Sequence, residues 1–281
     1  MPPVAQPDPS KKTKYPSISV KATNNIFTSV ARTTLASPAI QSGGKLLTFE
    51  DLDQFSGFVL YEANLPKFSR DPSNLVITKL RDRAQIYIDG KYAGALSREN
   101  NIDSMPISAG FGKRIQILVE NQGRINFQEN FDLKGILGEV TVQTFKEPYT
   151  EELTDWTITG YAFEDYGKIE SFIASDVFEF KPLKNGYLRE GPTLFYGELI
   201  INQESDIADT WWDTKGWGKG VLFINGINLG RYWPLVGPQK TMFIPKSILK
   251  QGINSFVILE QQKVSQDLLV NFTDEPDFNE D

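Results

Sequence analysis

The residues best suited to chemistry in this chain are aromatic and cluster in its second half. Trp217, Tyr232 and Trp233 lie close together in sequence, and Arg231 precedes two of them. An aromatic face can stack on the C–H face of a sugar ring, and an arginine can donate to its hydroxyl groups. Tryptophan also fills cores and interfaces, because it buries a large area. We expect packing within the protein for this cluster, with carbohydrate contact by Trp217, Tyr232, Trp233 and Arg231 as the alternative.

The composition excludes several kinds of catalytic and metal site. The chain has no His and no Cys, so a Ser-His-Asp triad, a Cys-His dyad, a thiolate zinc site and a disulfide cannot form. Carboxylates remain, and 120–121 and 260–261 each place a Glu and an amide where an apolar strand ends. Calcium binding through such oxygens is one interpretation. We expect a turn-closing role instead, and no metal or cofactor.

Two hairpin turns position these residues. Asn225-Gly226 follows a buried apolar strand, and Asp89-Gly90 follows another one in the first half of the chain. Both pairs accept the positive φ of a type I′ turn, the tightest connection between antiparallel strands. Gly230 follows the second turn by four residues, as Gly94 follows the first.

The strands around these hairpins also repeat in order. Residues 57–65 and 114–121 flank the first hairpin as 192–200 and 254–261 flank the second. A repeat this long exceeds the roughly 20–50 residues of a solenoid unit and fits a duplicated domain. Many short strands with turns between them predict an all-β protein of two tandem β-sandwich or jelly-roll domains.

The predicted boundaries follow from these strands. Residues 1–45 are expected to form a mostly irregular linker, 46–150 the first sandwich, 151–272 the second and 273–281 an acidic tail. Residues 164–172 fit either a loop or one turn of helix, and the sequence predicts no long helix.

Charge and hydropathy narrow the partners. The chain of 281 residues carries 29 basic and 36 acidic residues and a net charge of -7, which argues against nucleic acid. It has no apolar run long enough to span a membrane. Early prolines interrupt residues 1–16, which do not resemble a secretion signal. Asn271 begins an N-glycosylation sequon, which matters only in the secretory pathway.

Several motifs, in order along the chain, resemble the C-terminal β-region of the β-galactosidases of glycoside hydrolase family 35. They cover roughly residues 57–272, and those that carry the likeness are 82–84, 118–127, 132–136, 153–156, 216–220, 224–234 and 237–239. The resemblance implies two jelly-roll, galactose-binding-like domains packed against a catalytic barrel that bears two catalytic Glu residues. The family's Asn-Glu motif for the acid matches only 279–280, in the tail, so no catalytic residue is carried over.

Three hypotheses about function follow. The resemblance implies non-catalytic domains that support the barrel of an enzyme removing terminal β-galactose, with homo-oligomer contacts and a lysosomal or secreted location. A large exposed apolar face would favour this hypothesis. An independent module that binds galactose-containing glycans would show solvent-exposed coplanar aromatics instead. A free-standing glycosidase would need a cleft with two carboxylates about 5–5.5 Å apart.

Overall fold

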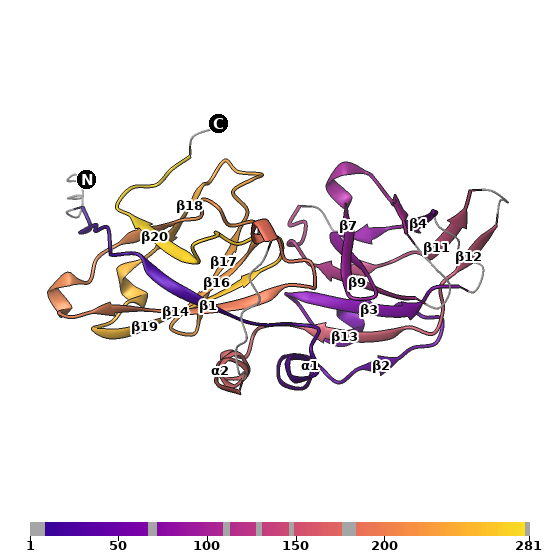
Figure 1. Cartoon of the computed structure of the whole chain (residues 1–281), viewed down its shortest axis with the longest axis horizontal. Coiled ribbons are helices and arrows are strands. Elements are labelled where there is room, and N and C mark those ends of the chain that lie inside the picture. Colours follow the sequence, from indigo (N-terminus) through magenta and orange to yellow (C-terminus); the bar gives the residue numbers. More distant parts are fainter. Residues whose placement is uncertain are drawn as a thin grey trace, which may run out of the picture. The chain divides into compact units, whose positions relative to one another are not determined.

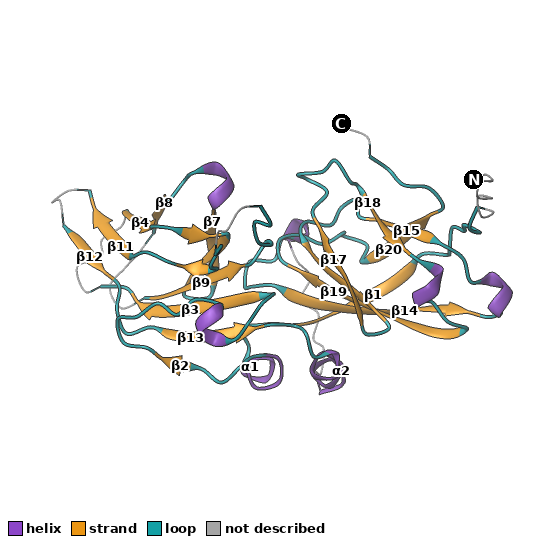
Figure 2. Cartoon of the chain, turned by 180° about the vertical axis from the view of Figure 1, so that it is seen from behind, coloured by secondary structure: helices purple, strands orange, loops and turns teal. Residues whose placement is uncertain are grey.

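A computed structural model describes residues 9–66, 72–108, 113–127, 131–145, 149–175 and 184–278. The chain divides into two compact units, one of residues 26–174 with 189–191, the other of residues 1–25, 175–188 and 192–281. We call them the first and the second sandwich. Both are built mainly of strands (Figures 1 and 2), so the all-β prediction is confirmed. Within the described part of the chain no helix is long and apolar enough to cross a membrane.

The first sandwich pairs a large sheet with smaller ones. Its elements are α1 (Ser29–Leu35), β2 (Ile40–Gln41), η1 (Glu50–Leu52), β3 (Phe58–Asn64), β4 (Ser73–Ile77), β5 (Leu80–Arg81), β6 (Arg83–Ile88), β7 (Lys91–Ser97), η2 (Arg98–Asn100), β8 (Ser104–Ile107), β9 (Arg114–Glu120), β10 (Gly135–Ile136), β11 (Val140–Thr144), β12 (Thr150–Glu152), β13 (Thr157–Tyr161) and α2 (Tyr166–Ser175). The six-stranded sheet has the order β2-β13-β3-β9-β6-β7, and a four-stranded sheet has the order β12-β11-β4-β8. β5 and β10 form a separate two-stranded ladder.

The large sheet of this sandwich is buried on both faces in its centre. Alternate residues of β9, such as Ile117 and Val119, join the apolar core. The other face carries Glu62 and Gln116, which are also buried. Arg32 of α1 donates to both carboxylate oxygens of Glu62 at 2.6 and 2.8 Å. A buried carboxylate is costly unless it is paired, so this fork stabilises the ion as α1 covers the sheet.

The second sandwich is a single eight-stranded sheet. Its elements are β1 (Ile18–Asn25), η3 (Lys184–Gly186), β14 (Thr193–Ile201), η4 (Glu204–Asp206), β15 (Thr210–Asp213), β16 (Gly220–Ile224), β17 (Ile227–Tyr232), β18 (Thr241–Ile244), η5 (Lys246–Ile248), β19 (Gly252–Glu260) and β20 (Leu269–Thr273). The order is β17-β16-β19-β14-β1-β20-β15-β18. The ring of Phe272 on β20 contacts that of Phe256 on β19, with centroids 5.6 Å apart. Contacts between strands so distant in the order show that the sheet curls into two layers.

The two sandwiches share an order of strands. The series β7-β6-β9-β3-β13 in the first matches β17-β16-β19-β14-β1 in the second. Each hairpin turn is left-handed at both residues, with φ of 47° and 73° at Asp89-Gly90 and 50° and 87° at Asn225-Gly226. Each hairpin also shifts register three residues after the turn, so that Gly94 pairs with Ile86 and Gly230 with Leu222.

The domain boundaries differ from those expected. Residues 18–25 are not linker: β1 pairs with β14 and β20 inside the second sandwich, which therefore encloses the first in sequence. The first sandwich extends past residue 150, because β13 pairs with β3. Residues 164–172, left open between a loop and one helical turn, belong mostly to α2, whose Ile169 and Phe172 are buried. Residues 1–8 of the expected linker and 279–281 of the expected tail lie outside the described residues.

Candidate functional site

Most of the aromatic cluster of the second sandwich lies in its core. Trp212 is fully buried, and its ring packs edge-on against Trp217 and Tyr232, with centroids 5.5 and 4.7 Å away. Trp217 is 4% exposed, contacts Phe195 at 5.6 Å and donates its indole N–H to the carbonyl of Leu269. Trp217 therefore has no free face to offer a sugar ring, and Tyr232 is buried as well.

Tyr232 is held by a buried carboxylate at the end of β19. Its hydroxyl donates to Glu260 Oε2 at 2.7 Å, and burial together with the neighbouring carboxylate raises the tyrosine pKa well above its ordinary value. Gly220 makes room for this contact, because a Cβ there would lie 2.5 Å from the tyrosine oxygen. The Tyr232 hydroxyl thus stays protonated and donates to Glu260.

Glu260 also closes the loops at this end of the sandwich. Five backbone N–H groups donate to its two oxygens at 2.7–3.2 Å, from residues 218, 219, 261, 262 and 263. Burial is the largest influence on its pKa and raises it, while the backbone hydrogen bonds act the other way. Glu260 therefore acts as a structural cap at the end of its strand, as the sequence led us to expect.

Trp233 and Arg231 occupy a different environment from Trp217. Trp233 is half-buried, the ammonium group of Lys219 lies 4.9 Å from its ring centroid, and Arg231 is exposed. With Tyr232 both residues line a cavity of about 240 Å³. Its remaining walls come from Thr214, Val236, Gly237, Gln239, Thr241 and Met242. The structure thus brings three of the four carbohydrate candidates to one cavity and leaves Trp217 in the core.

The turn residues do more than provide positive φ. The Asn225 side-chain oxygen accepts from Ser255 N–H at 3.0 Å, and Asp89 accepts from Arg114 N–H at 2.9 Å. Both turns are therefore anchored to the neighbouring strand. Asn271 lies within β20 and accepts from the Ser17 hydroxyl, so the sequon sits on a strand and not on a loop.

Sequence reasoning missed a buried charge cluster in the first sandwich. Lys134 is fully buried, and its ammonium group donates to both oxygens of Asp82 and to Asp132 at 2.8–2.9 Å. Arg98 donates to the same two carboxylates. Burial opposes ionisation of Asp132, but hydrogen bonds from Lys134 and the Ile125 N–H lower its pKa to about 2. The Asp-x-Lys spacing of 132–134 was the available signal, and Asp82 lies too far away in sequence to be linked to it.

This cluster contains two neighbouring carboxylates, the arrangement that a retaining glycosidase requires. One of a glycosidase's two carboxyl groups must donate a proton, which needs a raised pKa. Asp132 has the opposite shift, and Lys134 and Arg98 neutralise both aspartates. Among the described residues, no group of three or more acidic side chains could hold a metal ion.

Two protein-family models match the two sandwiches. The family model described as "Beta-galactosidase, first all-beta domain" matches residues 47–162, and that described as "Beta-galactosidase, galactose-binding domain" matches residues 192–254. The chain belongs to the β-domain region of the β-galactosidases. The first match ends just after β13, in agreement with the fold. The second contains the core tryptophans, Arg231 and Trp233.

Whole β-galactosidases are the chain's curated relatives. "Beta-galactosidase 17" of Arabidopsis thaliana is 32% identical over 97% of this chain and 40% of the relative. The β-galactosidase of Bos taurus is 35% identical over 83% of this chain and 37% of its own length, and that of Homo sapiens is 34% identical over 76% and 32%. The chain thus spans about two fifths or less of the length of these relatives. A lectin from Pleurotus ostreatus aligns over 94% of this chain and 79% of its own, with 11% identity and a TM-score of 0.25.

Proposed function

We propose that this chain is the non-catalytic C-terminal β-region of a glycoside hydrolase family 35 β-galactosidase. Its role is to support the catalytic barrel that removes terminal β-linked galactose. The proposal rests on one observation: the aromatic cluster of the second sandwich is mostly inside the core, whereas large apolar side chains are exposed on loops of the first sandwich. A lysosomal or secreted location, glycosylation at Asn271 and homo-oligomer contacts belong to the same proposal.

Four exposed apolar side chains lie on loops of the first sandwich. Phe55, Phe127 and Phe131 are 68%, 73% and 95% exposed, and Ile125 is also exposed. The loops are tied together, because the side chains of Asn121 and Arg124 donate to the carbonyl oxygen of Phe55. Large apolar side chains exposed to water are typical of a surface that a partner covers. The relatives are longer than this chain, and their catalytic barrel is the partner that we propose for this surface.

A hybrid enzyme tests this proposal. The matched region of the bovine relative is replaced by this chain, and hydrolysis of a chromogenic β-galactoside is measured with the chain alone as the reference. We expect turnover by the hybrid and none by the chain. Replacing Phe127 and Phe131 by Ser should lower the melting temperature of the barrel in the hybrid. It should leave the melting temperature of the chain alone unchanged.

The matched control is Leu235→Ser, since Leu235 is 84% exposed on a loop of the second sandwich. It should leave the barrel of the hybrid unaffected. Turnover by the chain alone would contradict the proposal, and so would equal effects of the phenylalanine and the leucine changes.

The second candidate function is a carbohydrate-binding module. The cavity beside Trp233 favours it, because a half-buried indole and an exposed guanidinium line the same space. Galactose binding to the chain that disappears in Trp233→Ala, with the melting temperature retained, would support this candidate.

A further inference from the structure

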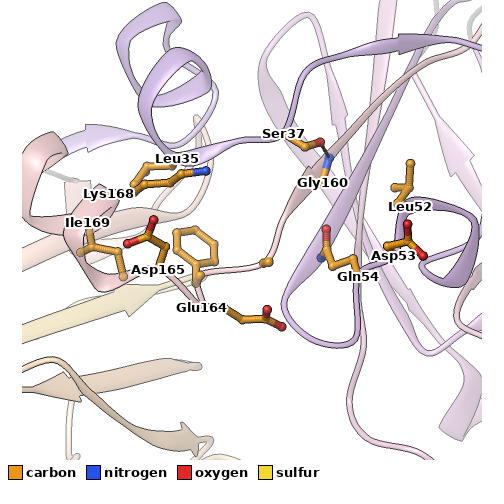
Figure 3. Close-up of a pocket in the computed structure, with 12 residues that line it drawn as sticks. Leu35, Ser37, Leu52, Asp53, Gln54, Gly160, Glu164, Asp165, Lys168 and Ile169 are labelled. Atoms are coloured by element: carbon orange, nitrogen blue, oxygen red, sulfur yellow. Dashed lines mark hydrogen bonds between the residues drawn. The ribbon is translucent and has the colours of Figure 1, made fainter.

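The first sandwich has a pocket of its own, which shares no residue with the Trp233 cavity; its residues Asp53 and Gln54 directly precede the exposed Phe55. Its volume is about 250 Å³. Figure 3 shows Asp53 and Gln54 on one side, and Asp165, Lys168 and Ile169 on the other. The buried lining includes Leu35, Phe163 and Ile169, and the exposed rim carries Asp53, Glu164, Asp165 and Lys168.

The buried polar group in this pocket is the amide of Gln54. The residue is only 6% exposed, and its Nε2 donates to the carbonyl oxygens of Ser56 and Phe58 at 2.6 and 2.9 Å. No described residue donates to its Oε1. This oxygen is not among the fully buried polar atoms, so it is open to a hydrogen-bond donor from outside the protein.

Gly160 makes room for that oxygen. A Cβ on Gly160 would lie 2.2 Å from Gln54 Oε1 and 3.3 Å from the Ser37 hydroxyl oxygen. Gly160 does not have a positive φ, so its backbone conformation does not demand glycine. Its N–H donates to the Ser37 hydroxyl at 2.9 Å. Gln54, Gly160 and Ser37 thus form one polar wall.

The rim of the pocket is rich in acceptors. One oxygen of Glu164 accepts from the Ser56 hydroxyl, and one oxygen of Asp165 accepts from Gly167 N–H. Their other oxygens, and the whole carboxylate of Asp53, receive no hydrogen bond from the described residues. Three carboxylates against one lysine disfavour an anion. A metal is disfavoured too, because the described acidic side chains form no group that could hold one.

From this geometry we propose that the pocket binds a neutral polyhydroxylated ring, a single hexose or a glycan end. Hydroxyl groups supply the donors that Gln54 Oε1 and the rim carboxylates lack, and Lys168 can donate back. The apolar lining from Leu35, Phe163 and Ile169 suits the C–H face of such a ring. The volume lies below the roughly 300–1,000 Å³ of sites for larger ligands, which limits the ligand to about one ring.

The test is nuclear magnetic resonance of the isotope-labelled 281-residue chain, titrated with D-galactose, D-glucose, galacturonate and glucosamine. The neutral hexoses should shift the backbone amide signals of Gln54, Gly160 and Glu164 with millimolar affinity, and galacturonate should bind more weakly. Asp53→Ala should weaken binding about fivefold or more, as expected for a lost hydrogen bond to a charged group. Asp53 is exposed but has a left-handed φ of 50°, so this change should lower the melting temperature slightly. Asp53→Asn tolerates that φ and should weaken binding with the melting temperature retained.

Glu99→Ala is the matched control, because Glu99 is an exposed carboxylate of the same sandwich; it should bind as the unaltered chain does. Absence of shifts in the pocket, binding of the glucosamine cation alone, or equal affinity in the Asp53 and Glu99 variants would each overturn the proposal. Shifts confined to residues 231–233 would overturn it as well, and would support the binding-module candidate. None of these outcomes bears on the hybrid enzyme, so the two proposals fail separately.

Discussion

Replacing Trp217 by Ala decides whether the aromatic cluster is core or binding surface. The change removes an indole that contacts Trp212 and Phe195 and donates to Leu269. Truncating a buried Trp costs about 3–5 kcal/mol, from lost transfer energy and from the cavity left behind. A domain of this size loses roughly 4 °C in melting temperature per kcal/mol. The transition of the second sandwich should therefore fall by about 12–20 °C.

Differential scanning calorimetry on the whole chain measures this shift without relying on tryptophan fluorescence. Trp233→Ala is the internal comparison, because that ring is only half-buried and should cost clearly less. Trp217→Phe should fall between the unaltered chain and Trp217→Ala. The reasoning is refuted if Trp217→Ala melts as the unaltered chain does, above all if it also loses a galactose signal that the unaltered chain gives.

Three further predictions concern the turn, the charge cluster and the enclosing strand. Gly226→Val should cost about 1–3 kcal/mol in urea unfolding, because φ there is 87°, whereas Gly226→Asn should cost much less; equal losses would mean that packing requires the glycine. The folded-state pKa of Asp132, about 2, lies below its unfolded value near 4, so this group contributes stability above about pH 4 that is lost as pH falls toward 2. Urea midpoints between pH 2.5 and 6 should show that loss, and Asp132→Asn should be less stable at pH 7 and less sensitive to pH over this range; an unchanged pH dependence would count against the assignment. Deleting residues 1–25 should remove hydrogen-exchange protection from β14 and β20 but not from β3 and β9, and retained protection in β14 would contradict the role of β1.

Local signals in the sequence were the ones that predicted structure well. Asn225-Gly226 and Asp89-Gly90 are read within a few residues, because positive φ at adjacent positions is a property of the dipeptide. The internal repeat then indicated two sandwiches, although it does not say which strands pair within them. The anchoring of each turn residue to the next strand was not visible, since Ser255 and Arg114 lie 30 and 25 positions away.

Contacts between distant segments could not be predicted. The short strand at 18–25 has no local mark that assigns it to β14, which lies beyond the whole first sandwich. In the same way, Trp217 lies between two glycines and could equally have pointed outward from a loop. Its burial depends on Phe195 and Leu269, which surround it only after the sheet curls.

The two sandwiches share an order of strands but differ in their buried charges. Asp82 directly precedes β6 and lies beside the end of β9, because its N–H donates to the Glu120 carbonyl. Lys219 directly precedes β16 and lies beside the end of β19, because its carbonyl accepts from Gln261 N–H. Both Asp82 and Lys219 are buried, yet their charges are opposite. In the first sandwich Lys134 neutralises the aspartate, and in the second the lysine lies over Trp233 while backbone N–H groups satisfy Glu260. A buried charge needs a partner but not a particular one, so the same backbone supports two unrelated polar networks. The second network brings a lysine and an indole together beside the Trp233 cavity, which is why that end of the second sandwich, and not its counterpart at Asp82, carries the candidate for glycan contact.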